Sequence, residues 1–144
     1  MNLLYCGDAG ISRGVLVSIL SLLMNGRKRY DAKNRVMTDG AGPVPEYHIY
    51  IMTVKYRGVK PFLKKTAEFL DKLVKEGAAG KIEGNPKSFV KLIDATEAFL
   101  QDLPEKNMGT YFTPCAMLRL YMDKVPELAR LERVLYLDYD VVCR

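Results

Sequence analysis

Cysteine and histidine are scarce in this sequence of 144 residues, which contains three cysteines and one histidine. Cys6, Cys115 and Cys143 are far apart and form no CxxC pair, so their spacing indicates neither a zinc site nor a disulfide framework. His48 stands alone and is more typical of a packing residue than of a metal ligand. The simplest interpretation is a cytoplasmic protein whose thiols stay reduced.

Long apolar runs are also lacking. Residues 15–24 form the longest run after the N-terminus, but Ser18 and Ser21 interrupt it and it is too short to cross a bilayer. Residues 1–6 have no basic start and too short an apolar stretch for a signal peptide. We therefore expect no transmembrane segment, which leaves peripheral contact with a membrane as the possible membrane interaction.

The composition is that of a folded domain, with 49% hydrophobic and 27% charged residues. The net charge of +5, from 22 basic and 17 acidic residues, weakly favours an anionic partner. The densest basic cluster is Arg27, Lys28 and Arg29, and no aromatic residue is interleaved with it. That pattern favours a solvated loop over a nucleic-acid site, so we expect no nucleic-acid partner.

Apolar runs and helical periodicity alternate along the chain. Strands are expected at residues 3–6, 47–54, 88–93 and 133–137, helices after Ser12, at 61–77 and at 113–124, and a loop at 25–45. This alternation predicts an α/β fold, a Rossmann-like and mostly parallel sheet with flanking helices. Residues 134–137 are continuously apolar, which predicts a central strand covered on both faces.

Acidic residues follow three of the expected strands. Asp8, Asp94, Asp138 and Asp140 would lie at the carboxyl edge of the sheet, where ligands of such folds bind. Asp138 and Asp140 are alternate residues, so on a strand both carboxylates would face one side. They are hard oxygen ligands suited to Mn²⁺ or Mg²⁺ holding a diphosphate. Acids at strand ends also simply begin turns, and two acids alone do not decide between these readings.

The segment from Val134 to Val142, VLYLDYDVV, resembles the DxD segment of glycosyltransferase family 8, the retaining enzymes that include glycogenin and bacterial lipopolysaccharide glycosyltransferases. Residues 3–8, LLYCGD, and the apolar helix that follows resemble the first strand and helix of that family. Residues 113–122 resemble its helix that carries a donor-binding arginine, and Asp94-Ala95-Thr96 resembles a corresponding turn. The resemblance is weak between residues 27 and 86.

The resemblance implies a retaining glycosyltransferase with a GT-A type domain, a UDP-sugar donor (glucose or galactose), and Mn²⁺ or Mg²⁺. The acceptor could be a saccharide, a lipid-linked glycan or a protein. By the same resemblance Asp138 and Asp140 bind the metal, and Asp8 lies near the uracil. The residues that would contact the donor are Cys6, Gly7, Asp8, Arg119, Asp138, Tyr139 and Asp140.

Three features depart from the family pattern. Tyr139 is bulkier than the usual residue, and Met117 stands where an aromatic residue is common. The sequence also stops four residues after Asp140, whereas the family has a later histidine that completes the metal site. We therefore expect residues 1–144 to be the N-terminal, nucleotide-sugar-binding part of a longer domain, unable to transfer sugar by itself.

Two other functions fit parts of the pattern. A haloacid-dehalogenase-like phosphohydrolase also uses an Asp-x-Asp-x-Val motif after an apolar strand, with Asp138 as nucleophile and Asp140 as acid and base. That motif usually opens its domain, whereas here it closes the sequence. The third possibility is a non-catalytic nucleotide-binding fragment.

Overall fold

The centre of the molecule is a four-stranded sheet in which every neighbouring pair of strands is parallel. The computed structural model describes residues 1–34, 36–40, 42–78, 82–101 and 114–143. The strands of the sheet are β1 (Asn2–Cys6), β4 (His48–Thr53), β7 (Phe89–Asp94) and β8 (Leu135–Tyr136), in the spatial order β7-β4-β1-β8. The α/β class, the parallel sheet and the flanking helices expected from the sequence are confirmed.

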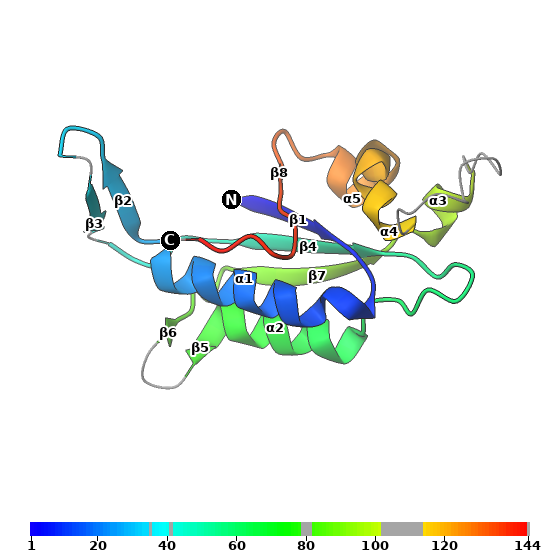
Figure 1. Cartoon of the computed structure of the whole chain (residues 1–144), viewed down its shortest axis with the longest axis horizontal. Coiled ribbons are helices and arrows are strands. Elements are labelled where there is room, and N and C mark those ends of the chain that lie inside the picture. Colours follow the sequence, from blue (N-terminus) through cyan, green and yellow to red (C-terminus); the bar gives the residue numbers. More distant parts are fainter. Residues whose placement is uncertain (35, 41, 79–81, 102–113, 144) are drawn as a thin grey trace.

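Helices cover both faces of this sheet (Figure 1). One face is packed by α1 (Ser12–Asn25) and α2 (Lys64–Glu76). The opposite face is packed by α3 (Thr96–Gln101), α4 (Pro114–Met117), the 3-10 helix η3 (Leu118–Lys124) and α5 (Pro126–Ala129). The chain therefore changes face after β7, before it returns to the other side of β1 as β8.

Strand β1 is the most deeply buried element. Leu3, Leu4 and Tyr5 are each fully buried, with alternate side chains entering the two opposite cores. This is the pattern of a parallel strand covered on both faces. The one polar atom that β1 sends into the α1 side, the Tyr5 hydroxyl, lies 2.8 Å from the Ser18 hydroxyl on α1.

Strand β8 differs from the expected central strand. Only Leu135 and Tyr136 have strand geometry, and within the described residues β8 pairs with β1 alone, at the edge of the sheet. Leu135 is 51% exposed for that reason. The continuously apolar run at residues 134–137 therefore predicted a strand correctly, but it predicted the wrong position of that strand in the sheet.

The segment after β8 packs on the α1 face. Leu137 donates its amide to the Leu4 carbonyl, and the Cys143 amide donates to the Ser21 hydroxyl at 2.9 Å. Asn25 donates to the Cys143 carbonyl, also at 2.9 Å. These bonds hold the segment after β8 against β1 and the C-terminal half of α1.

The expectation of a loop at residues 25–45 is wrong. A two-stranded antiparallel hairpin, β2 (Lys28–Asp31) and β3 (Val36–Asp39), projects there from the body of the molecule (Figure 1). The Asp31 carboxylate closes its turn by accepting hydrogen bonds from the Asn34 side chain and from the backbone amides of Asn34 and Lys33. These hydrogen bonds, that of the Asn34 side chain most of all, lower the pKa of Asp31. A segment rich in glycine and charged residues suggests a loop, but this composition does not reveal whether two parts of the segment pair as strands.

The limits of two helices also differ from those expected. The helix expected from Pro61 begins at Lys64, because Pro61 forms a β-bridge with Asp8 and the Phe62 amide donates to the Thr53 hydroxyl. Its end at Gly77 is as expected, with φ of 79° that suits glycine. The helix expected at 113–124 is instead the short α4 followed by η3, and the first residue of the expected helix, Thr113, lies outside the described residues.

The remaining described elements are small. They are the 3-10 turn η1 (Ala9–Ile11) and the two-residue strands β5 (Gly77–Ala78) and β6 (Ile82–Glu83), which pair with each other. Among the described helices, none combines the length and the apolar character that crossing a bilayer requires.

The buried Tyr5–Ser18 hydrogen bond gives a test of how β1 is held on α1. We expect Tyr5→Phe to lower the free energy of unfolding by about 1–3 kcal/mol, because it leaves the buried Ser18 hydroxyl without this partner. Adding Ser18→Ala should cost less than in the wild-type background, since both partners are then gone. Urea unfolding of the two single variants and the double variant measures this; strictly additive losses would contradict it.

Candidate functional site

A cleft of about 370 Å³ opens where the carboxyl ends of β1 and β8 lie side by side. Its walls come from segments more than 100 residues apart in the sequence. The residues that line it are Cys6, Gly7, Asp8, Gly10, Ile11, Cys115, Ala116, Tyr136, Asp138 and Tyr139. Of the seven predicted donor-contacting residues, the structure brings five together in this cleft and leaves Arg119 and Asp140 outside its lining.

The first wall is the end of β1 and the turn after it. The Gly7 amide donates to the Met52 carbonyl on β4 at 3.0 Å, which continues the sheet to the rim of the cleft. The Asp8 carboxylate accepts the Gly10 amide at 2.8 Å and so caps η1. Asp8 thus has the turn-capping role considered for it, and its remaining carboxylate oxygen has no protein partner among the described residues.

The second wall is the end of β8. The Tyr136 hydroxyl donates to Oδ1 of Asp138 at 2.7 Å. Burial, followed by the neighbouring Asp138, raises the pKa of Tyr136 to about 12, while Arg119 opposes that rise. The hydroxyl therefore stays protonated near neutral pH and holds Oδ1 of Asp138 in place, while Oδ2 takes no part in this hydrogen bond.

Arg119 stands just outside the cleft, next to this wall. It lies on η3, and its guanidinium carbon is 5.4 Å from the centre of the Tyr136 ring. Among the described residues no carboxylate lies within ion-pair distance of Arg119, including Asp123 four residues later. Tyr136 therefore connects the two charged residues, supporting the arginine with its ring and the aspartate with its hydroxyl.

Asp138 and Asp140 are not presented by a strand, as the alternation argument assumed. β8 ends at Tyr136, and the Val141 amide donates to the Asp138 carbonyl, which closes a turn over residues 138–141. A turn does not keep the two-residue alternation of a strand, so Asp138 lines the cleft whereas Asp140 is exposed beside it.

Tyr139 is held by a close approach to α1. A Cβ atom added to Gly14 would lie 2.6 Å from Tyr139 Cδ2 and 2.7 Å from the Tyr139 carbonyl oxygen. Only glycine leaves room at this helix position for the turn that carries Asp138. The bulky Tyr139 thus forms part of the cleft wall by resting on the glycine of α1.

The two cleft thiols do not provide a nucleophile. Burial raises the pKa of Cys6 to about 12 and that of Cys115 to about 11. Both thiols are therefore protonated near neutral pH, and a protonated buried thiol is unreactive. Cys6 and Cys115 instead make part of the cleft an apolar, polarisable surface.

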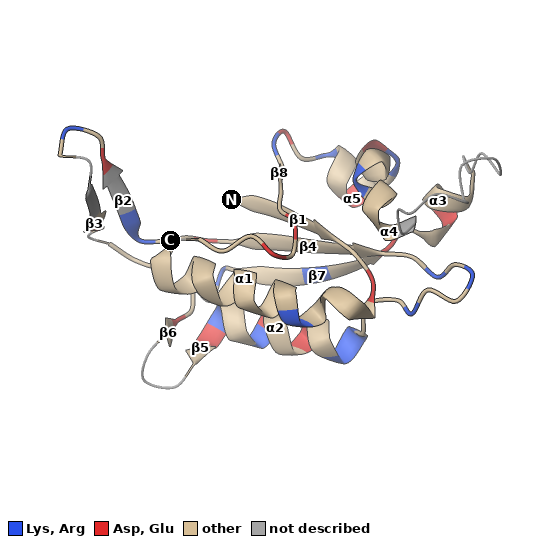
Figure 2. Ribbon diagram, viewed as in Figure 1, with Lys and Arg blue, Asp and Glu red and all other residues tan. Residues whose placement is uncertain are grey.

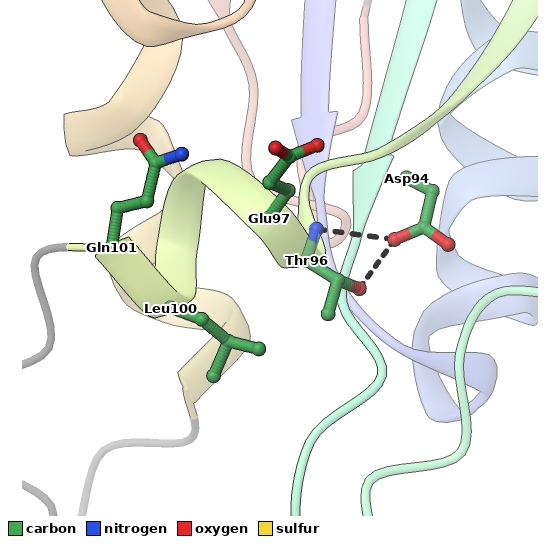
Figure 3. Close-up of a pocket in the computed structure, with 5 residues that line it drawn as sticks. All are labelled: Asp94, Thr96, Glu97, Leu100 and Gln101. Atoms are coloured by element: carbon green, nitrogen blue, oxygen red, sulfur yellow. Dashed lines mark hydrogen bonds between the residues drawn. The ribbon is translucent and has the colours of Figure 1, made fainter.

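Asp94, at the end of β7, does not line the cleft. It accepts hydrogen bonds from the Thr96 amide and hydroxyl (Figure 3), and its other oxygen pairs with Lys55 at 2.9 Å. Partial burial disfavours the carboxylate, but the bonds from Thr96 and Lys55 outweigh it and lower the pKa of Asp94. Strand β4 separates β7 from β1. Asp94 therefore lies at the expected sheet edge, where it fixes the start of α3 beside an open hollow of about 590 Å³, away from the cleft.

The carboxylates at the cleft fit a hard divalent ion only in part. Asp138 has one oxygen not engaged by Tyr136, and Asp140 is two residues away in the same exposed turn. No cluster of three or more histidine, cysteine, aspartate or glutamate side chains suited to a metal occurs among the described residues. An ion held here would thus have at most two protein carboxylates and would need a ligand's diphosphate or water for the rest.

Sequence reasoning missed half of the cleft lining, namely Gly10, Ile11, Cys115, Ala116 and Tyr136. Tyr136 had a usable signal, because it stands two residues before Asp138 next to a strand end. Cys115 and Ala116 lie in the segment 113–122 that resembles the donor-binding helix of the family, but only the packing of α4 on the sheet brings them to β1. His48 packs as expected: its ring stacks on Phe89 with centroids 4.6 Å apart.

Comparison of the chain with models of protein families, with curated proteins and with solved structures finds no match.

The Gly14 contact predicts a variant that disturbs the cleft without weakening a helix. Alanine is favoured over glycine within helices by about 1 kcal/mol, yet at this position its Cβ would collide with the Tyr139 backbone. We expect Gly14→Ala to lower the melting temperature and to increase amide exchange at residues 138–141. Val17→Ala, at a half-exposed position one turn later, is the control; equal exchange in the two variants would mean that the contact does not hold the turn.

Proposed function

We propose that the cleft binds a UDP-sugar and that the chain carries the donor site of a retaining, GT-A type glycosyltransferase. The observation that carries the proposal is the meeting of two distant segments in one cleft. Residues 6–8 and residues 138 and 139 come from the two segments whose resemblance to glycosyltransferase family 8 implies donor contacts, and they line the same 370 Å³ space.

The position of the cleft supports a nucleotide ligand on physical grounds that are independent of the resemblance. In chain order the sheet reads third, second, first and fourth strand, so the connections reverse direction between β1 and β8. The connection that follows β1 crosses the α1 face of the sheet, whereas the connection that leads into β8 crosses the opposite face. Open parallel sheets bind nucleotides outside the carboxyl ends of the strands at such a reversal.

The charges around the cleft suit a diphosphate between a nucleoside and a sugar. In the proposed complex the uridine lies against Cys6, Gly7 and Asp8, where two protonated thiols offer an apolar wall. Arg119 offers a planar guanidinium that can bind phosphate oxygens in a bidentate manner. Its stacking on Tyr136 restricts its motion, so less conformational entropy is lost when a phosphate binds.

Asp138 and Asp140 are the residues that would hold Mn²⁺ or Mg²⁺. When bound, the ion would neutralise charge on the departing UDP. The hydrogen bond from Tyr136 fixes the orientation of Asp138, so this side chain is positioned before any ligand arrives.

The carboxylates give the direct test of this proposal. We expect Asp138→Asn and Asp140→Asn each to abolish manganese-dependent binding of UDP while leaving the melting temperature nearly unchanged, because both side chains are exposed and contribute charge rather than packing. Titration calorimetry with UDP, with and without manganese, measures this. Asp123→Asn removes an equally exposed acid from η3 and is the control.

Unchanged affinity in both variants would remove the metal site from the proposal. Thermal stabilisation by beryllofluoride and magnesium, with no response to UDP, would instead support a phosphohydrolase in which Asp138 is the nucleophile.

Arg119→Ala should weaken binding of UDP about ten- to hundredfold but leave binding of uridine nearly unchanged, since a charge-assisted hydrogen bond contributes roughly 1.5–3 kcal/mol. The control is Arg130→Ala, which removes an exposed arginine at the end of α5. Calorimetry with both ligands makes the comparison. Equal losses of UDP and uridine affinity in Arg119→Ala would show that this residue acts on the structure of the cleft alone.

A further inference from the structure

The loop after β4 and the start of α2 form a concentrated cationic surface. Residues 55–65, KYRGVKPFLKK, contain five basic residues and no acidic one. Figure 2 shows the blue segments on this projecting loop and on the adjoining end of α2. The backbone turns sharply at Arg57 and Gly58, with φ of 30° and 78°, which carries the loop away from the sheet. We call residues 55–65 the basic loop.

The basic loop is fixed beside the cleft. The Ala9 amide donates to the Lys60 carbonyl at 2.8 Å, and Pro61 forms a β-bridge with Asp8. Asp8 is itself a lining residue of the cleft. The cationic surface and the mouth of the cleft therefore lie at the same edge of the sheet, and a partner bound to one is brought to the other.

Most of this charge is not neutralised within the protein. Lys55 pairs with Asp94, and Lys64 lies 3.8 Å from Glu68. Arg57, Lys60 and Lys65 are exposed, and no described carboxylate lies within ion-pair distance of them.

The charge at the start of α2 also works against the helix. Lys64 and Lys65 occupy its first turn, which contains no acidic residue. Cations there oppose the positive end of the helix dipole, so the protein maintains this surface at a cost in stability. An external anion would remove that cost.

Exposed apolar side chains are interspersed with these cations. Leu63 and Phe69 are each 57% exposed, Leu63 next to Lys64 and Phe69 one turn after Lys65. An apolar side chain between cations suits the boundary of a bilayer, where the lysines reach lipid phosphates and the apolar groups enter the acyl region. A free phosphate ligand, by contrast, would gain no binding energy from the exposed apolar side chain of Leu63.

We propose that the basic loop docks the protein on an anionic lipid surface, with Arg57, Lys60 and Lys65 contacting lipid phosphates and Leu63 entering the interface. Docking in this way turns the mouth of the cleft toward the membrane. The proposal is independent of the transferase activity, because it rests on charge and exposure outside the cleft.

Co-sedimentation with vesicles tests the proposal. We expect binding to phosphatidylcholine vesicles that contain phosphatidylglycerol, weakening as salt rises, and no binding to pure phosphatidylcholine. The triple variant Arg57→Gln, Lys60→Gln, Lys65→Gln should bind about a hundredfold more weakly, since each basic residue near an anionic bilayer strengthens binding about fivefold. Leu63→Ser should weaken binding about tenfold.

Matched control variants distinguish lipid binding by the basic loop from an effect of the total charge or of exposed apolar side chains in general. Lys28→Gln, Lys33→Gln, Lys87→Gln removes three exposed cations elsewhere, and Leu120→Ser removes an apolar side chain of similar exposure. Both should bind vesicles like the wild type. Equal loss in either control, full binding by the basic-loop triple variant, or loop-dependent binding of RNA without binding of anionic vesicles would overturn the proposal. Calorimetric titration of the basic-loop variants with UDP and manganese should give the wild-type affinity for UDP. The result for the donor site is therefore independent of the result for lipid binding.

Discussion

The fold depends on the burial of β1 from both sides. Its apolar side chains alternate between two cores, one formed with α1 and α2 and the other with the helices after β7. A parallel strand can be covered in this way only if the connections cross over both faces of the sheet. The exchange of faces after β7 follows from that requirement, and it brings β8 to the free side of β1.

The cleft is a consequence of the same arrangement. The connection after β1 and the connection into β8 cross opposite faces of the sheet, and the cleft opens beyond the ends of these two strands. The side chains there are arranged before any ligand binds: Tyr136 holds Asp138 and supports Arg119, and Gly14 accommodates the turn that contains Tyr139. Binding residues fixed by such contacts lose little entropy when a ligand arrives.

Charge is distributed unevenly around this edge of the sheet. Asp94 and Lys55 neutralise each other at the end of β7, whereas the basic loop beyond β4 keeps several unpaired cations close to Asp8. An edge with a positive rim attracts anions generally. The rim and the cleft are nevertheless built from different residues, so each can be altered while the other stays intact.

The sequence alone determined the class of the fold, the parallel strands at the expected positions, the approximate span of α1 and α2, and the residues 6–8 and 138–139 that line the cleft. Periodicity and strand-end positions are local properties, and they suffice for these features. They do not suffice for pairing across long separations. The hairpin at residues 28–39, the edge position of β8, the break between α4 and η3, and the arrival of Cys115 at the cleft were decided by tertiary packing. The same holds for Asp138 and Asp140, of which only Asp138 lines the cleft, because a turn closed by one backbone hydrogen bond replaces the strand that their spacing predicted.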